Sequence, residues 1–236
     1  PLVSGASALY WERHRNIYRE DPSPALVKAI FTAVATNLAG RLDANGRVMP
    51  QPPNRFAGWG RIDLDAVLNP GVSVWLHDQQ TVLASSGADY NVDLVVDDPA
   101  QPVRVMLAWT DAPGPGTGGT TPAWTNDLDL SAHIGAATWR GNVIDAASGF
   151  SAEGGSADSR NNLEGIFLSP AQHAGNLIHL RVLAATIAAD ALSPHAPGSP
   201  RQDFALVCYN CRARVEAVFD DGCESVADGV FANGFE

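Results

Sequence analysis

From Val72 onward the chain consists of short runs of β-branched and aromatic residues, separated by Gly, Pro, Asp and Asn. Such runs predict strands, and many strands joined by polar loops predict an antiparallel β-sandwich or jelly roll. Residues 113–122 are all Gly, Pro and Thr, which predicts an exposed loop. The strands are expected near residues 72–76, 81–84, 90–96, 102–109, 127–133, 136–140, 163–168, 177–185 and 203–209.

The first 69 residues have a helical period instead. Apolar residues recur at helical spacing from Leu2 to Ile17 and again from Val27 to Leu38. The second helix should begin at Ser23-Pro24, a good N-cap followed by proline in the first helical position, and should end at Gly40. A loop rich in Pro, Asn and Gly then leads to a short helix ending near Leu68.

Charge and composition exclude two classes of protein. The chain carries 26 acidic and 15 basic side chains, and its only lysine is Lys28. Because the arginines are scattered, no basic stripe is available for a phosphate backbone, and no nucleic-acid partner is expected. The longest apolar run is far shorter than the roughly 20 residues that cross a bilayer, so no membrane segment is expected either.

Three cysteines, Cys208, Cys211 and Cys223, fall near the C-terminus. An odd number favours one disulfide and one spare thiol, whichever two residues pair. The C-x-x-C spacing of Cys208 and Cys211 is also found in zinc sites, but no histidine follows to complete one. A disulfide is the better interpretation, and it favours an oxidising, extracellular compartment.

Two sets of sequence strings carry a family resemblance. The opening PLVSGASALYWER resembles the helix that follows the catalytic serine of subtilisin-like serine proteases. PSPALVKAIFTAVATNL and GWGRIDLDAVL resemble the next helix and the closing strand-turn-helix of that protease domain. VMLAWTDAPG, WTNDLDL, GN, DSRNNLEGIFL and QDFALV then occur in the order seen in bacterial subtilases with a C-terminal β-barrel or jelly-roll domain. The matching residues of the first string are Pro1, Val3, Ser4, Gly5, Ala6 and Leu9.

The resemblance covers residues 1–209 and implies a division into domains. Residues 1–69 would be the C-terminal end of a subtilisin-like α/β domain, and residues 70–209 a β-sandwich or jelly-roll domain. Residues 210–236 would be an acidic, cysteine-bearing tail, whose ending DGVFANGFE resembles short tags on secreted Gram-negative proteins. The expected fold class is therefore mostly β with an α/β remnant.

The same resemblance implies a function. The chain would be the C-terminal fragment of a secreted, extracellular bacterial serine endopeptidase. It is expected to be a monomer, and the intact enzyme would act on proteins or peptides through the missing protease domain. The nucleophilic serine would lie about four residues before Pro1, and the rest of the triad and the oxyanion-hole asparagine earlier still. Since the six histidines accompany no G-x-S-x-G elbow, a triad within the chain is not expected, and the chain alone should be inactive.

Acidic residues suggest a metal site. A strand period of two places Asp127 and Asp129 on one face, where two carboxylates repel unless a cation neutralises them. Asp111 and Asn126 add oxygen donors of the type that calcium prefers, and the family resemblance implies structural calcium too. The plainer interpretation is that these side chains accept hydrogen bonds from backbone in turns. A paired-carboxylate glycosidase is a further, weaker reading of the same residues.

A non-enzymatic alternative stays open. Jelly-roll modules often bind sugars on aromatic side chains, so the chain could be a binding or adhesion module. Trp109 lies in an apolar strand and is expected in the core, whereas Trp124 and Trp139 border polar stretches and are candidates for ligand contact. Every residue that would separate a protease from a binding module lies upstream of Pro1.

Overall fold

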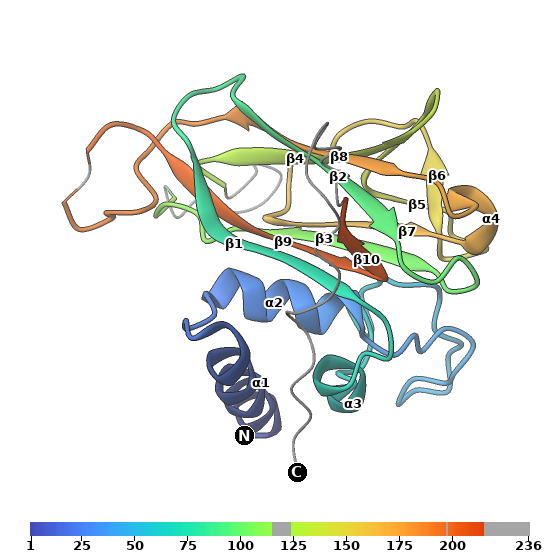
Figure 1. Cartoon of the computed structure of the whole chain (residues 1–236). Helices are drawn as coiled ribbons and strands as arrows, with labels where there is room; N and C mark the ends of the chain where they lie inside the picture. The colour runs from blue at the N-terminus through green and yellow to red at the C-terminus, as the bar shows by residue number, and fades with distance from the viewer. Residues whose placement is uncertain (115–123, 197, 215–236) are drawn as a thin grey trace, which may run out of the picture.

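Two antiparallel sheets stacked face to face dominate the computed structural model, which describes residues 1–114, 124–196 and 198–214 (Figure 1). One sheet has four strands in the order β1-β9-β3-β7, and the other has six in the order β10-β2-β8-β4-β5-β6. The strands are β1 Val74–Leu83, β2 Asp89–Val96, β3 Val103–Ala108, β4 Asp127–Ile134, β5 Ala137–Ile144, β6 Ser151–Glu153, β7 Leu163–Leu168, β8 Ile178–Thr186, β9 Gln202–Tyr209 and β10 Cys211–Ala213.

Strand β3 shows why the four-stranded sheet is apolar on both faces. Val105 and Leu107 point into the core between the two sheets, whereas Met106 and Ala108 point to the opposite face, which the N-terminal helices cover. A strand buried on both faces loses the usual polar alternation, which accounts for the run VMLA. The inward residues of the six-stranded sheet, such as Leu130 and Leu180, complete the sandwich core.

The helical layer consists of α1 Leu2–Tyr18, α2 Pro24–Ala33 and α3 Leu64–Leu68, and it lies against the outer face of the four-stranded sheet (Figure 1). Helix α2 begins where predicted, because the Ser23 side chain accepts a hydrogen bond from the Leu26 N–H and Pro24 follows it. Its buried side chains share one apolar cluster with β3, β7 and β9. Helix α4 Pro170–His173 lies after β7.

The sequence predicted most of these elements, and the structure differs from the prediction at the following places. The two strands predicted at 72–76 and 81–84 are one strand, β1 Val74–Leu83, whose pairing is irregular between Asp78 and Val82. The short strands β6 and β10 and the short helix α4 were not predicted. Helix α2 ends at Ala33 rather than at Gly40, because Thr36 leaves the helix to exchange two backbone hydrogen bonds with Arg61. The predicted loop at 113–122 lies almost wholly outside the described residues.

Helix α2 is anchored to the β-sandwich at both ends and in the middle. The Ser23 N–H donates to the Asp78 carboxylate on β1 at 2.7 Å, and the Lys28 ammonium donates to the Asn162 side chain at 2.9 Å. At its C-terminal end the Arg104 guanidinium of β3 donates to the carbonyls of Ala33 and Ala35, at 3.3 and 3.4 Å. The two predicted domains therefore share a buried core and polar contacts, and their division at residue 69 stays a prediction.

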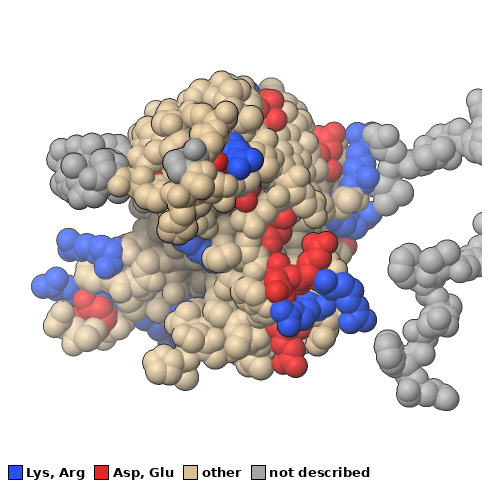
Figure 2. Space-filling view, turned by 90° about the vertical axis from the view of Figure 1, so that its left-hand side faces the viewer, with Lys and Arg blue, Asp and Glu red and all other residues tan. Residues whose placement is uncertain are grey.

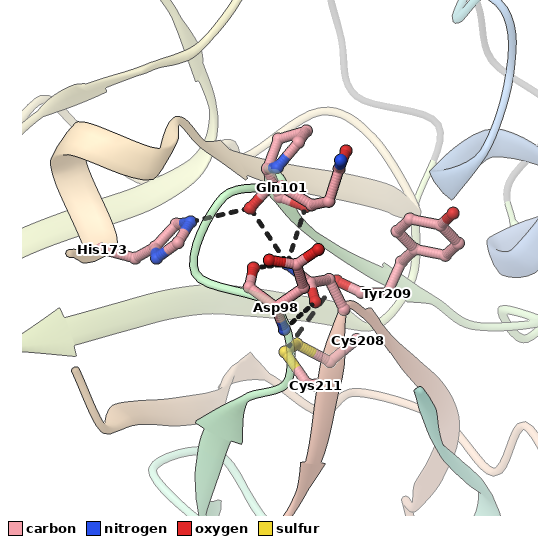
Figure 3. The surroundings of a disulfide bond; sticks show 8 residues. Asp98, Gln101, His173, Cys208, Tyr209 and Cys211 are labelled. Carbon is pink, nitrogen blue, oxygen red and sulfur yellow. Dashed lines mark hydrogen bonds between the residues drawn. A yellow bond between two sulfur atoms is a disulfide. The ribbon is translucent and has the colours of Figure 1, made fainter. Parts of the chain in front are cut away.

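A disulfide joins Cys208 and Cys211 where the chain passes from β9 in one sheet to β10 in the other (Figure 3). Both cysteines are fully buried in the sandwich core. Asn210, between them, has a φ of 67°, and its side chain donates to the carbonyls of Asp98 and Gln101 and accepts from the Asp98 N–H. The bridge therefore belongs to the fold rather than to the tail, and Cys223 lies outside the described residues.

No helix among the described residues combines the length and the apolar character needed to cross a bilayer.

Candidate functional site

The two aspartates of the predicted metal site lie on β4, as the strand period requires. Leu128 and Leu130 point into the sandwich core, and Asp127 and Asp129 point to the opposite face of the strand. Asp127 is nevertheless only 5% exposed, whereas Asp129 is half-buried. The face that the sequence predicted is confirmed, but one of its two carboxylates is enclosed by protein.

Asp111 organises the chain around the start of β4. Its Oδ1 accepts hydrogen bonds from the N–H groups of Ala112 and Asn126, both at 2.8 Å, and its Oδ2 accepts from the Thr125 N–H at 2.6 Å. Both carboxylate oxygens are thus already bound to backbone donors. This is the plain turn-forming role that the sequence left open as an alternative to metal binding.

Asn126 connects three segments of the fold. Its Nδ2 donates to the Ala189 carbonyl and to the Gln202 side chain, and its Oδ1 accepts from the N–H groups of Ala188 and Ala189. The residue is completely buried, and its backbone carbonyl accepts from the Trp109 indole at 3.1 Å. An amide with these partners is part of the framework, and its oxygen already accepts two hydrogen bonds.

Glu164 is an acid whose burial the sequence did not reveal. It lies on β7 and is completely buried, and its Oε2 accepts a hydrogen bond from the Leu130 N–H at 2.8 Å. That donor is free to bind a side chain because β5 pairs with β4 only along Ser131–Ile134. Glu164 therefore joins the two sheets where the edge of β4 has no strand neighbour.

Two carboxylate oxygens of these acidic residues have no hydrogen-bond partner among the described residues. They are Oδ1 of Asp127 and Oε1 of Glu164, both in the protein interior. Burial, followed by the charges of Asp129, Asp158 and Asp111, raises the pKa of Asp127 to about 6. Burial is also the main reason that the pKa of Glu164 is raised to about 9, against the lowering effect of the Leu130 N–H.

We name Asp127, Asp129, Asp158 and Glu164 the carboxyl cluster, because Asp158 raises the pKa of the other three, and Asp127 and Asp129 also raise that of Glu164. Arg140 is the positive charge that lowers the pKa of Asp129, although burial leaves that pKa raised. Asp158 accepts hydrogen bonds from Asn142 and Asn161. Apart from Arg140, the charged groups that shift these three pKa values are therefore acidic.

The predicted calcium ligands do not form one ligand set. In the described parts of the chain no three His, Cys, Asp or Glu side chains are grouped so that they could hold a metal ion. Asp111 and Asn126 use their oxygens for backbone contacts, which leaves Asp127 and Asp129 from the predicted four. Calcium requires six to eight oxygens, so this arrangement does not fit it without rearrangement. Calcium binding itself stays a prediction.

The histidines show no serine-protease triad within the described ranges. Ser131 and His133 contact each other at 3.2 Å, but the other ring nitrogen of His133 contacts the Thr138 hydroxyl rather than a carboxylate. Ser7 donates to the Val3 carbonyl within α1. A triad requires a carboxylate that orients the histidine, which His133 lacks.

His133 and His179 face each other across β4 and β8 with ring centroids 5.9 Å apart. They line an open surface hollow of about 580 Å³ together with Asn176. His179 contacts Asp93 at 2.7 Å, and His133 contacts hydroxyl groups through both of its ring nitrogens. Both rings therefore already have protein partners.

The tryptophans differ in their exposure. Trp109 is in the core as predicted, and Trp139 is only 4% exposed and belongs to the same core cluster. Trp139 therefore cannot serve as an exposed ligand platform, which corrects one of the two candidates. Trp124 is half-buried, donates to the Ser159 carbonyl, and borders a cavity of about 250 Å³. That cavity is also lined by Asp111, Ala112, Arg160, Asn161 and Asn162.

Helix α1 leaves much of its apolar surface uncovered. Its buried residues are Ala6, Tyr10 and His14, a single stripe at a spacing of four. Leu2 is 91% exposed and Val3 59%, and Leu9 and Ile17 are about half exposed. A shallow groove between α1 and α2 adds the side chains of Val3, Phe31 and Trp59. Exposed apolar surface of this kind is typical of a contact site.

On the face shown in Figure 2, basic side chains lie in small separate groups, several of them beside acidic ones. That face has no continuous basic field of the kind that binds a phosphate backbone. Neither a scan against protein-family models nor a search of curated proteins found a match to this chain.

Proposed function

We propose that this chain is the C-terminal part of a secreted subtilisin-like serine endopeptidase, in which the β-sandwich stabilises the protease domain. The proposal has two sources, the ordered sequence strings described above and the apolar surface of α1. In the intact enzyme a serine upstream of Pro1 would attack the peptide carbonyl while a histidine takes its proton. The present chain would supply support for that site rather than its reacting groups.

The single observation that carries the proposal is the uncovered face of α1. Leu2, Val3, Leu9 and Ile17 would each be covered in a self-sufficient fold, because burial stabilises an aliphatic side chain by about 1.5–3 kcal/mol. In a subtilisin-like domain the helix after the serine packs against the central sheet, so the same residues would be buried there. Helix α2 would then transmit this contact to the sandwich through its shared core.

The start of α1 suits a place beside the nucleophile. Its first turn has no side-chain cap and no acidic residue, so its N–H groups and the positive end of its dipole are available to a developing negative charge. In the proposed enzyme that charge is the oxyanion of acyl transfer. Small residues at Ser4, Gly5 and Ala6 permit close packing of this turn on a sheet.

The experiment is to express the coding region with its upstream part and label it with an active-site serine reagent such as a fluorophosphonate. We expect one labelled serine a few residues before Pro1, hydrolysis of a peptide substrate, and no labelling of the 236-residue chain alone. An upstream region without a reactive serine would contradict the protease proposal and favour a binding module. Deleting the β-sandwich from the unlabelled longer protein should accelerate the thermal loss of its peptidase activity.

One observation favours the alternative of a non-enzymatic binding module, namely the position of Trp124 beside a polar cavity. An indole next to Asp, Asn and Arg side chains is a composition that suits a saccharide. A saturable change in tryptophan fluorescence on sugar titration, lost in Trp124→Ala and retained in Trp75→Ala, would support this function. No saturable change would leave the protease proposal as the better one.

A further inference from the structure

The carboxyl cluster at the junction of β4 and β7 has a property that the proposed function does not use. Two of its oxygens, Oδ1 of Asp127 and Oε1 of Glu164, are enclosed by protein without a hydrogen-bond partner among the described residues. Buried polar atoms in folded proteins are almost always paired, so each such exception requires a compensating group. For a carboxylate that group is a proton or a cation.

The surroundings of Glu164 do not stabilise a negative charge. A buried carboxylate is tolerated when it is paired or receives several hydrogen bonds, and Glu164 receives one, from the Leu130 N–H. The charged groups that act on it from the neighbouring elements are Asp127 and Asp129 on β4 and Asp158 before β7, all of them acidic. Arg140 on β5 acts on Asp129 instead.

On the side of Glu164 that lies against β5, there is little room for a metal ion at Oε2. A Cβ added at Gly141 on β5 would lie 2.1 Å from Oε2 and 2.8 Å from the Glu164 Cβ, so this side chain lies directly against the β5 backbone. Calcium with its six to eight oxygens at 2.3–2.6 Å requires a roomier shell. A proton occupies no additional volume and removes the buried charge.

We propose that Glu164 is a neutral carboxylic acid in the folded protein, and that a bound proton rather than a metal ion compensates its buried carboxyl group. The acid keeps its Oε2 as acceptor for Leu130, and protonation gives the side chain an O–H donor that a carboxylate lacks. This inference does not depend on the protease assignment, because it concerns only contacts within the sandwich.

The direction of the pH effect follows from linkage. The ordinary pKa of Glu is 4.5, which applies to the unfolded chain, and the folded value is raised to about 9. Between these values the folded state binds one proton more than the unfolded state, so stability falls as pH rises through this window. Below pH 4.5 Glu164 no longer destabilises the folded state, and above pH 9 the loss of stability that it causes stays constant.

The test compares Glu164→Gln with the wild-type chain in urea unfolding at pH 5 to 9. Gln resembles the neutral acid in size and retains one oxygen acceptor and one donor group. Within this pH range, the unfolding equilibrium constant of wild type should rise by up to about tenfold per pH unit relative to that of Glu164→Gln. Glu164→Gln should therefore be nearly equal to wild type at pH 5 and clearly more stable at pH 8. Glu153→Gln, at an exposed position on β6, is the matched control and should follow wild type.

A second measurement keeps the inference falsifiable if the variant fails to fold. Carboxyl ¹³C NMR of wild type should show one Glu side chain that retains the protonated shift at pH 7. A Glu164 carboxyl that titrates near its ordinary value overturns the inference. So does a rise in Tm on adding calcium chloride at pH 7.5 that Glu164→Gln abolishes, because a cation would then be the compensating group. The inference is also overturned if the unfolding free energies of wild type and Glu164→Gln depend on pH in the same way.

Discussion

Helices α1 and α2 are neighbours in the chain, yet they are held in opposite ways. Helix α2 buries six of its ten residues and contacts the sandwich through Asp78, Asn162 and Arg104. Helix α1 has 17 residues and buries three. Its Arg15 forms an exposed ion pair with Asp21, in the turn that follows the helix. The difference teaches that α2 is part of the core that covers the β-sandwich, whereas α1 leaves most of its apolar side chains exposed.

The largest expected effect comes from breaking the α2 contact. Leu26→Ala removes a completely buried side chain that packs on β3 and β9, and it should lower the free energy of unfolding by about 2–5 kcal/mol. Urea unfolding followed by circular dichroism measures this. Leu2→Ala on α1 is the control and should change stability by less than about 0.5 kcal/mol. Equal losses would show that α1 and α2 do not differ.

Arg104 should have the next largest effect. Its guanidinium donates to the carbonyls of Ala33 and Ala35 and lies over the Phe167 ring, and burial lowers its pKa. Arg104→Met has a similar side-chain length but leaves these carbonyls without their donor. It should therefore lower the free energy of unfolding by about 1–3 kcal/mol. Hydrogen exchange should accelerate in α2 more than in β8.

The exposed Arg212 supplies the comparison for Arg104. Its nearest carboxylate oxygen, on Asp97, is 3.9 Å away, so Arg212→Met should cost less than about 1 kcal/mol. Loss of α2 protection in both variants would argue that charge in general, rather than the contact of Arg104 with α2, holds the helix.

Most of the fold could be predicted from the sequence because strand and helix periods are local signals. The alternation of Leu128 and Leu130 with Asp127 and Asp129 gave both the strand and its inner face. The extra length predicted for α2 shows the limit, since Thr36 pairs with Arg61, a residue 25 positions away in sequence. Such pairings depend on tertiary contacts that no local pattern contains.

The site was predictable only in part, for a similar reason. Asp127 and Asp129 are marked by their period, but Asp111 and Asn126 were assigned to a metal because their residue types suit one. Their actual partners are backbone N–H groups of Thr125, Asn126 and Ala188. Glu164 carries no sequence signal of burial, because its position depends on β7 packing beside the open edge of β4.

A smaller effect is expected at the N-terminus of α2. The Ser23 N–H and hydroxyl both donate to Asp78 on β1, which fixes the start of the helix to the sheet. Asp78→Ala removes both hydrogen bonds and should cost about 1–2 kcal/mol. Asp78→Asn retains an oxygen acceptor and should cost less, as measured by the urea midpoint. A larger loss for Asn than for Ala would contradict this role.

The smallest effect on the chain itself is expected at Leu9, and it sharpens the comparison most. Leu9 is 48% exposed on α1, so Leu9→Ser should change the stability of the 236-residue chain by less than about 0.5 kcal/mol. If the uncovered face packs against an upstream protease domain, the same substitution should lower the thermal stability of the longer protein by several degrees, because there it removes a buried side chain. Differential scanning calorimetry of both lengths measures this. Ala8→Ser, on the same helix, separates a helix-propensity effect from lost packing, and equal small shifts in both lengths would mean that α1 faces solvent in the longer protein as well.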